Sequence, residues 1–291
     1  MRRALGLAWV VPALALVGVF VYLPLVQNFG FSTLKWDIYS GGQEFVGLGN
    51  YLRLPRDPVF WTSLVNNVLY AAVSIVFQVF GALVLAALIE SIRSDRWRRS
   101  LRAIYFIPSA ISLTVAGLLF YFIYEPSIGP LNHALRAVGL GGLAEAWLGQ
   151  ESTAMGAIIA MSQWQGFGYS TLLFAVAIQR IPSEIYGAAL IDGTGPVRRF
   201  FSVTVPLVRE MTGLMTMVTI SGGFQVFNEV MVMTSGGPDN STQVLGTWLY
   251  RSGFVRNDFG YAAAIATVIF VITMAIAVGQ LWVARRRRVE W

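Results

Sequence analysis

Six long runs without charged side chains constrain what this chain of 291 residues can fold into. A helix needs about 20 apolar residues to cross a bilayer, and each run reaches or approaches that length. The runs are continuous rather than alternating, so they predict helices and not the strands of a barrel. We expect membrane spans at about 5–26, 65–89, 103–124, 154–179, 209–233 and 261–284.

The composition agrees with a chain that is embedded in a membrane. Hydrophobic residues make up 56% of the chain and charged residues only 12%, whereas soluble domains carry about 25% charged residues. There is no cysteine and there is one histidine, which excludes disulfides, thiolate sites and multi-histidine metal sites. We therefore expect an all-α integral membrane protein with no catalytic residue and no metal site.

The positions of the basic residues predict the orientation of the spans. Of the 21 lysines and arginines, 15 fall in segments that six spans would place on one side. By the positive-inside rule that side is the cytoplasm, and both termini lie there. The net charge of +6 then reflects topology and not nucleic-acid binding. We divide the chain into a first span with its outward loop (1–64), a five-span core (65–284) and a basic cytoplasmic tail (285–291).

The loop between the fourth and fifth spans carries the most specific pattern. Ser183 is expected to cap a short helix, and Glu184 suits the positive end of that helix. Asp192-Gly193 should end it, and Thr194 is expected to cap a second short helix before the span that Pro206 starts. From these residues alone, the loop is either a tight connection or a docking surface.

This loop resembles the EAA loop of ABC-importer permeases of the carbohydrate-uptake group, which includes the maltose and glycerol-phosphate systems. The matching residues are Pro182, Tyr186, Ala188, Ala189, Asp192, Gly193 and Pro206. Gly187 stands where the family has a glutamate, and Thr194 where it has an alanine. Further similar segments follow in the family's order: Gly47 to Tyr51, Thr234 to Pro238, Tyr250 to Phe254 and Phe259 to Ala264.

The resemblance implies a six-span permease fold and a division of labour among several chains. A second six-span permease completes a heterodimer, two ABC ATPase subunits bind ATP and Mg in the cytoplasm, and a solute-binding protein delivers a sugar or related polar solute outside. It also implies a bacterial-type plasma (inner) membrane. The residues that would couple to the ATPase are Glu184, Tyr186, Gly187, Ala188, Ala189, Leu190, Asp192 and Gly193.

One short segment is similar to an ATPase motif but does not indicate an enzyme. Tyr39 to Gln43 resembles the LSGGQ signature of ABC ATPases. It lies in a predicted outward loop, and the chain has no phosphate-binding G-x-x-x-x-G-K-[ST] motif, since its single lysine is Lys35. ATP hydrolysis is therefore expected on another polypeptide.

Polar residues inside the fourth and fifth spans are candidates for the substrate pathway. They need a partner or a water-filled cavity in a bilayer, and hydrogen bonding between helices is the alternative to ligand contact. Ser162, Gln165 and Tyr169 share one predicted helical face, and so do Ser221, Gln225 and Asn228. The resemblance to the importer permeases implies that the substrate pathway is lined by Gln165, Gly166, Tyr169, Ser221, Phe224, Gln225 and Asn228.

Three points stay open from the sequence. Glu229 is expected to pair with a basic group on the partner permease or to face water at the outer side. Which of the two permeases holds the sugar is undecided. The alternative to an importer permease is a secondary transporter or channel-like protein without an ATPase partner, although no internal repeat supports it.

Overall fold

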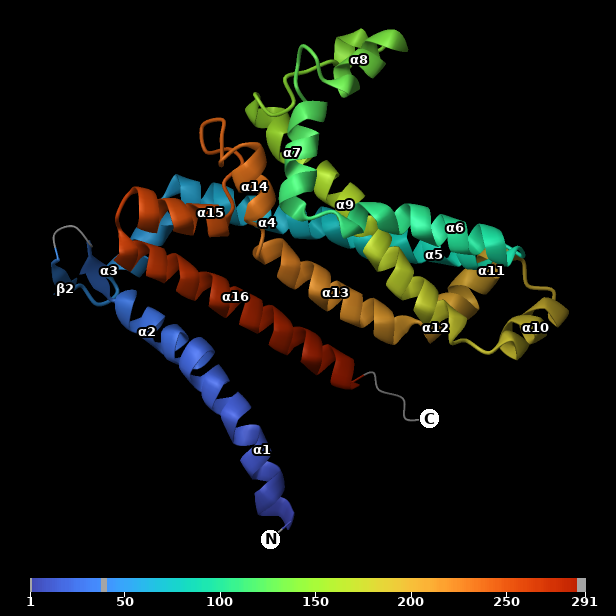
Figure 1. Cartoon of the computed structure of the whole chain (residues 1–291), viewed down its shortest axis with the longest axis horizontal. Helices are drawn as coiled ribbons and strands as arrows, with labels where there is room; N and C mark the ends of the chain where they lie inside the picture. The colour runs from blue at the N-terminus through green and yellow to red at the C-terminus, as the bar shows by residue number, and fades with distance from the viewer. Residues whose placement is uncertain (1, 38–40, 287–291) are drawn as a thin grey trace. The chain divides into compact units, whose positions relative to one another are not determined.

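The computed structural model describes residues 2–37 and 41–286. Most of these residues are helical (Figure 1), which confirms the predicted all-α membrane fold. One short antiparallel hairpin joins β1 (Leu34–Trp36) to β2 (Gln43–Phe45), with Lys35 opposite Glu44. Tyr39 and Ser40 of the ATPase-like segment, and residues 287–291 of the predicted tail, lie outside the described residues.

Contacts divide the chain into two units. Unit 1 consists of Met1–Trp61 with Leu245–Ile272, and unit 2 consists of Thr62–Val244 with Thr273–Trp291. Unit 1 joins the first helix to the last by hydrogen bonds, because the Asn28 amide donates to the Ala263 carbonyl (3.2 Å) and to the Thr267 hydroxyl (3.1 Å). Unit 2 contains the predicted coupling loop and all the predicted pathway residues.

Within the described residues, three helices are long and apolar enough to cross a membrane by their length and composition. They cover Val10–Phe31, Pro58–Glu90 and Phe259–Gln280. Their elements are α1 (Arg2–Val17), η1 (Gly18–Tyr22) and α2 (Leu23–Phe31); α4 (Pro58–Ser74), η3 (Ile75–Gly81) and α5 (Ala82–Glu90); and α16 (Phe259–Arg286). Large apolar side chains such as Phe80 and Leu88 stay exposed along them, as a lipid-facing surface requires.

The predicted third span is bent rather than straight. α6 (Asp95–Phe106) and η4 (Ile107–Ala110) turn by 92° into α7 (Leu113–Ile123). Pro108 lies at this bend, where its ring cannot continue the hydrogen-bond ladder of a helix. The Ser112 hydroxyl then caps α7 by accepting the N–H of Val115 at 3.3 Å. The expected continuous helix over 103–124 is therefore wrong.

The predicted fifth span is also discontinuous. α13 (Arg209–Phe224) is bent by 72° against the helical turns that precede it, and it ends at Phe224. After Gln225, Val226 and Phe227 the chain resumes as α14 (Asn228–Met233), so the expected helix over 209–233 is wrong (Figure 1). If each bent pair is one span, the part of the chain that the structure describes has up to five membrane-crossing segments by length and composition.

The predicted fourth span, over 154–179, corresponds to α9 (Glu151–Gln179), the longest described α-helix. It is long enough to cross a bilayer, but it is not among the helices apolar enough to count as a span. Its middle holds the polar residues from Ser162 to Ser170, and these lower its hydropathy. α9 packs against α5 through buried Ala82, Ala86, Phe174 and Ala175.

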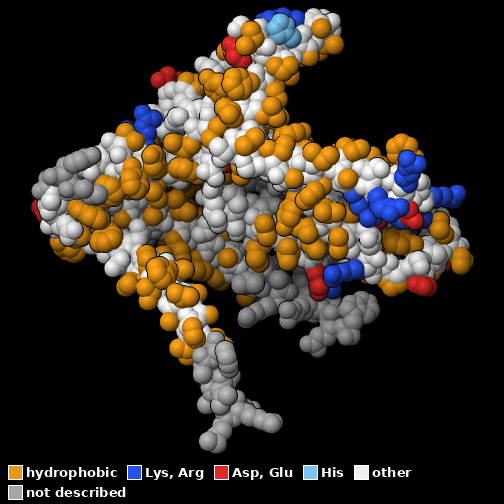
Figure 2. Space-filling model, viewed as in Figure 1, with side chains coloured by type: hydrophobic (Ala, Val, Ile, Leu, Met, Phe, Trp, Pro, Cys, Tyr) orange, Lys and Arg blue, Asp and Glu red, His pale blue; other side chains and the backbone are white. Residues whose placement is uncertain are grey.

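Short elements connect these segments. Unit 1 adds α3 (Gly49–Arg53), η2 (Leu54–Arg56), α15 (Leu245–Tyr250) and η7 (Arg251–Val255). Unit 2 adds α8 (Pro130–Ala137) and η5 (Gly141–Leu143) before α9, then α10 (Ser183–Ile191), α11 (Pro196–Arg199), η6 (Phe200–Thr204) and α12 (Val205–Leu207) after it. Figure 2 shows basic side chains gathered at the end of unit 2 that carries α6 and α11.

Candidate functional site

The predicted coupling helix exists and ends where the sequence indicates. Gly193 has a φ of +70°, a conformation that glycine adopts without strain. Its N–H donates to the Leu190 carbonyl (3.0 Å), and the N–H of Thr194 donates to the Ala189 carbonyl (3.0 Å). These two bonds form a Schellman motif, which satisfies the last carbonyls of α10.

Both predicted caps of this loop are wrong. Pro182 occupies the cap position of α10, and Ser183 is its first helical residue. Gly195 precedes α11, and the Thr194 hydroxyl instead donates to the Ala189 carbonyl of α10. The next long helix begins at Arg209 and not at Pro206, which lies in α12.

The predicted coupling residues lie on two different faces of α10. Ala189 is buried, and the half-buried Tyr186 makes a hydrogen bond of 3.0 Å to the Thr204 hydroxyl, so these two side chains face their own chain. The outward side chains include Ile191, which is 89% exposed, and Ile185. Neither isoleucine was among the predicted residues. Glu184, Ala188, Leu190, Asp192 and Gly193 are exposed, and Gly187 is half-buried.

An ion pair and a cavity lie beneath this loop. The Arg102 guanidinium of α6 binds the Glu90 carboxylate of α5 with two bonds, Nε to Oε1 at 2.8 Å and Nη2 to Oε2 at 2.6 Å. Such bidentate pairs add geometric specificity, so the pair fixes the ends of α5 and α6 against each other. A cavity of about 570 Å³ lies between α5 and the loop, lined by residues that include Glu90, Tyr186 and Leu190.

The predicted pathway residues of α9 are held against the bend of the third span. The Gln165 side-chain amide donates to the Ile111 carbonyl at 3.0 Å. The Ser109 hydroxyl donates to the Gln165 carbonyl (2.7 Å) and accepts the N–H of Tyr169 (3.0 Å). A β-carbon at Gly166 would lie 2.8 Å from the Gln78 amide nitrogen. Tyr169 itself is 50% exposed.

Ser162 does not share the surroundings of Tyr169, although the two lie on one face of α9. Ser162 is buried and makes a hydrogen bond to the Tyr70 hydroxyl of α4. Ser162 is buried on α9 whereas Tyr169 is exposed. Helical spacing alone therefore does not identify which residues of this face are accessible.

The fifth-span residues likewise do not form one helical face. Ser221 and Phe224 lie in α13, Gln225 lies in the break, and Asn228 begins α14. Gln225 and Asn228 are exposed, Ser221 is half-buried and Phe224 is buried. The shared face of Ser221, Gln225 and Asn228 requires a continuous helix, so that prediction is wrong.

Glu229 does not face water. It is 4% exposed, and its Oε1 accepts a hydrogen bond of 2.7 Å from the Tyr70 hydroxyl. Tyr70 thus bonds both Ser162 and Glu229 and joins α4, α9 and α14. Sequence reasoning missed Tyr70 because one hydroxyl in an apolar run gives no signal of its partners.

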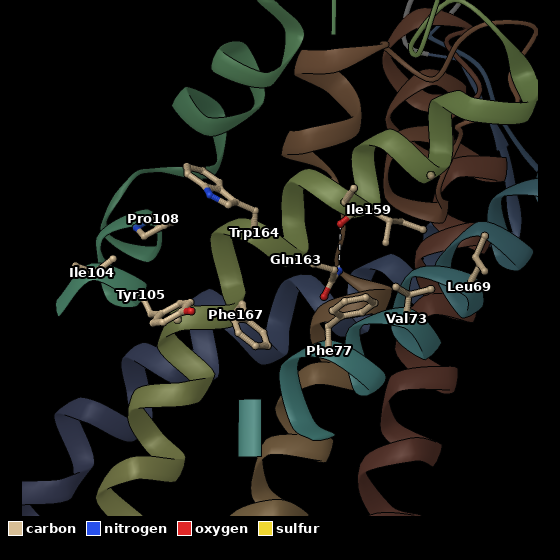
Figure 3. A pocket seen from close by; sticks show the side chains of 13 residues that line it. Leu69, Val73, Phe77, Ile104, Tyr105, Pro108, Ile159, Gln163, Trp164 and Phe167 are labelled. Atoms are coloured by element: carbon tan, nitrogen blue, oxygen red, sulfur yellow. Dashed lines mark hydrogen bonds between the residues drawn. The ribbon is translucent and has the colours of Figure 1, made fainter. Parts of the chain in front are cut away.

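A larger cavity of unit 2 is apolar and does not contain the predicted pathway residues. It measures about 790 Å³ and lies among α4, η3, α6, η4 and α9. Figure 3 shows Phe77, Tyr105, Trp164 and Phe167 around it, with the Gln163 amide hydrogen-bonded to the Ile159 carbonyl at 3.3 Å. The same amide also donates to the Ser74 hydroxyl at 3.0 Å. The cavity therefore offers few free polar groups to a sugar.

Charged residues of the predicted outward loops are paired locally. In unit 1, Arg53 binds Asp258 at 2.7 Å beside a polar cleft of about 540 Å³ that Lys35 and Arg256 also line. In unit 2, the backbone N–H of Ile128 donates to the Glu125 carboxylate at 2.5 Å. This bond, helped by the Ser127 hydroxyl, lowers the pKa of Glu125.

Within residues 2–37 and 41–286, no group of three or more His, Cys, Asp or Glu side chains could hold a metal ion. Four acidic residues of the described chain are engaged with arginines, hydroxyls or backbone N–H groups: Glu90, Glu125, Glu229 and Asp258. The chemistry of the site is therefore that of recognition and contact, carried by amides, hydroxyls and aromatic rings.

Comparisons with known proteins agree with this architecture. A family model described as "Binding-protein-dependent transport system inner membrane component" matches residues 79–289. The "Probable ABC transporter permease protein YurN" of Bacillus subtilis (strain 168) is 47% identical over 94% of this chain and 93% of its own length. The "Lactose transport system permease protein LacF" of Rhizobium radiobacter is 32% identical over 97% and 95%.

A solved structure shows the same fold. The crystal structure of a bacterial ABC transporter involved in the import of the acidic polysaccharide alginate has a chain that superposes with a TM-score of 0.86. The two chains are 21% identical, over 99% of this chain and 97% of the other.

The apolar helices, together with the matched family model and relatives, identify the permease component of a transporter. This chain belongs to the family of inner membrane components of binding-protein-dependent transport systems. It is the permease of an ABC importer, which works with a solute-binding protein and with a separate ATPase subunit that handles ATP.

Proposed function

We propose that this importer carries a carbohydrate or a related polar solute, and that the solute passes along α9 and the break between α13 and α14. The observation that carries the proposal is the set of uncharged side chains exposed there, namely Tyr169, Gln225 and Asn228. Amides can bond sugar hydroxyls, and a tyrosine offers both a ring face and a hydroxyl. The lactose permease relative supports the same substrate class. Gln165, Gly166, Ser221 and Phe224 complete the proposed path as its walls.

The assembly that we propose contains a second six-span permease and two ATPase subunits, with Mg and ATP bound only by the latter. Both termini face the cytoplasm of a bacterial-type inner membrane, because 15 of the 21 basic residues then lie inside. Along the sequence, the proposed division remains a first span with its loop (1–64), a five-span core (65–284) and a basic tail (285–291) that ends inside.

The proposed contact with the ATPase is the outward face of α10. Glu184, Ala188, Leu190 and Asp192 from the predicted set are exposed there, together with Ile185 and Ile191. Tyr186 and Ala189 hold the helix on its own chain, Gly187 leaves room beside it, and Gly193 ends it. Gly187 replaces the family's glutamate, so we propose that the contact depends mainly on apolar burial.

The pathway proposal is tested by sugar uptake into vesicles that contain the assembled importer. Tyr169→Ala and Asn228→Ala should each lower kcat/KM for uptake by about 2- to 13-fold, the range expected for one lost hydrogen bond. Tyr121→Ala is the matched control, because Tyr121 lies on α7 and is 46% exposed, close to Tyr169 at 50%. Uptake at the wild-type level in both pathway variants would refute the path.

A further inference from the structure

The break in the fifth span is fixed from both sides by one turn of α4. On the α13 side, the Asn67 side-chain amide donates to the Gly223 carbonyl at 2.7 Å. On the α14 side, the Tyr70 hydroxyl donates to Glu229 Oε1 at 2.7 Å. Asn67 and Tyr70 are three residues apart, so they lie on the same side of α4, roughly 4.5 Å apart along its axis.

The bond from Asn67 satisfies a backbone group that the break leaves open. The last four carbonyls of a helix have no partner within the helix, and Gly223 is the second-last residue of α13. The Gln225 N–H returns to the Gly222 carbonyl at 2.9 Å, and Asn67 supplies the donor for Gly223. Asn67 is fully buried, where an unpaired carbonyl would be costly.

Close packing explains why the break lies at this position. A β-carbon at Gly223 would be 2.7 Å from the Ala71 β-carbon and 2.9 Å from its α-carbon. Only a glycine lets the backbone of α13 come this close to α4. Ala71 directly follows Tyr70 in α4 and lies one helical turn after Asn67, so backbone approach and side-chain bonds act at one place.

The α14 side is anchored more widely. Glu229 is the second residue of α14, and its carboxylate lies near the positive end of that helix. Tyr70, which binds it, also bonds Ser162 of α9, and all three side chains are buried. α14 is therefore tied to the helix that carries Tyr169.

We propose that Asn67, Tyr70 and Glu229 are positioning residues that hold the α13–α14 break in one geometry. They thereby set the positions of the exposed Gln225 and Asn228. The transport consequence rests on the proposed function, in which Gln225 and Asn228 meet the solute. The claim that these residues fix the geometry of the break does not rest on the proposed function, and it is tested separately.

The geometric test uses a cysteine reporter in the break of the assembled importer. The chain has no native cysteine, so Gln225→Cys gives a single reactive thiol, because Gln225 is exposed. Its reaction rate with a water-soluble maleimide should change at least threefold when Asn67→Ala or Tyr70→Phe is added. Glu229→Gln should stay within twofold of the parent, because the glutamine Oε1 still accepts the Tyr70 bond, whereas Glu229→Ala should behave like Tyr70→Phe.

The matched control is Asn66→Ala on the same helix. Asn66 is also buried and donates to the Ser241 carbonyl (2.7 Å) and the Gln243 carbonyl (2.8 Å), away from the break. It should leave the rate within twofold. Thr171→Val is a second control, since the Thr171 hydroxyl donates to the Phe167 carbonyl of its own helix at 2.8 Å.

Uptake measurements separate this proposal from the proposed function. Asn67→Ala and Tyr70→Phe should raise KM for uptake by about 2- to 13-fold. Altered cysteine reactivity with an unchanged KM would support the positioning role and refute the path through Gln225 and Asn228. The positioning role is overturned if neither Asn67→Ala nor Tyr70→Phe changes the reactivity, or if both controls change it as much.

Discussion

Ile191 gives the most direct access to the proposed ATPase contact. It is a large apolar residue at the end of α10 and 89% exposed, so it stabilises little within its own chain. If α10 docks into the ATPase, this side chain is buried there. Ile191→Ala should therefore weaken ATPase association while leaving the fold of the permease unchanged.

The size of the effect follows from the atoms removed. The substitution deletes three carbon atoms, and at about 0.8 kcal/mol for each buried group the loss is about 2.4 kcal/mol, or roughly 60-fold in Kd. The assay titrates purified ATPase subunit onto the permease complex in nanodiscs and measures Kd. Binding-protein-stimulated ATP hydrolysis in the same nanodiscs provides a second readout.

Ile128→Ala is the matched control for this measurement. Ile128 is 75% exposed, and it lies in the predicted outward loop between α7 and α8. It should bind ATPase like the wild type, and both variants should keep the wild-type Tm. Equal ATPase affinity in Ile191→Ala and Ile128→Ala would refute the docking of α10.

Three further outcomes are expected. Gly187→Ala should raise the free energy of unfolding by about 1 kcal/mol in calorimetry, because a β-carbon there meets no atom within 4 Å; a loss of stability would mean that the space is needed. Ser94 and Asp239 are both exposed. A cysteine in place of Ser94 should react with an impermeant maleimide only from inside, and a cysteine in place of Asp239 only from outside. The reverse pattern would overturn the topology. The lowered pKa of Glu125 means that its turn is stabilised above the ordinary carboxyl pKa and loses this stabilisation as pH falls through the lowered value. Amide exchange at Ile128 should therefore accelerate at low pH in the wild type and show no such step in Glu125→Gln.

The helices and the coupling loop were predictable because their signals are local. Long apolar runs specify helices in a bilayer, and Asp192-Gly193 specifies the end of α10. The bend of the third span also had a local signal in Pro108. These features depend on residues that are close together in the sequence.

The break in the fifth span was not predictable in the same way. It contains no proline, and the side chains that hold it, Asn67 and Tyr70, lie more than 150 residues earlier in the chain. The faces of α10 could not be assigned either, because Ile185, Ala188, Ala189, Leu190 and Ile191 are all apolar. Burial of Ala189 and exposure of Ile191 depend on contacts with distant helices.

The central claim is that this chain moves a solute only as part of an ATP-driven complex. The direct measurement is uptake of a radiolabelled disaccharide into vesicles that contain the permease, its partner permease and the ATPase. Uptake should require ATP on the α10 side and solute-binding protein on the opposite side, and should stop when either is omitted. Uptake by this chain without ATP, driven by an ion gradient, would contradict the account.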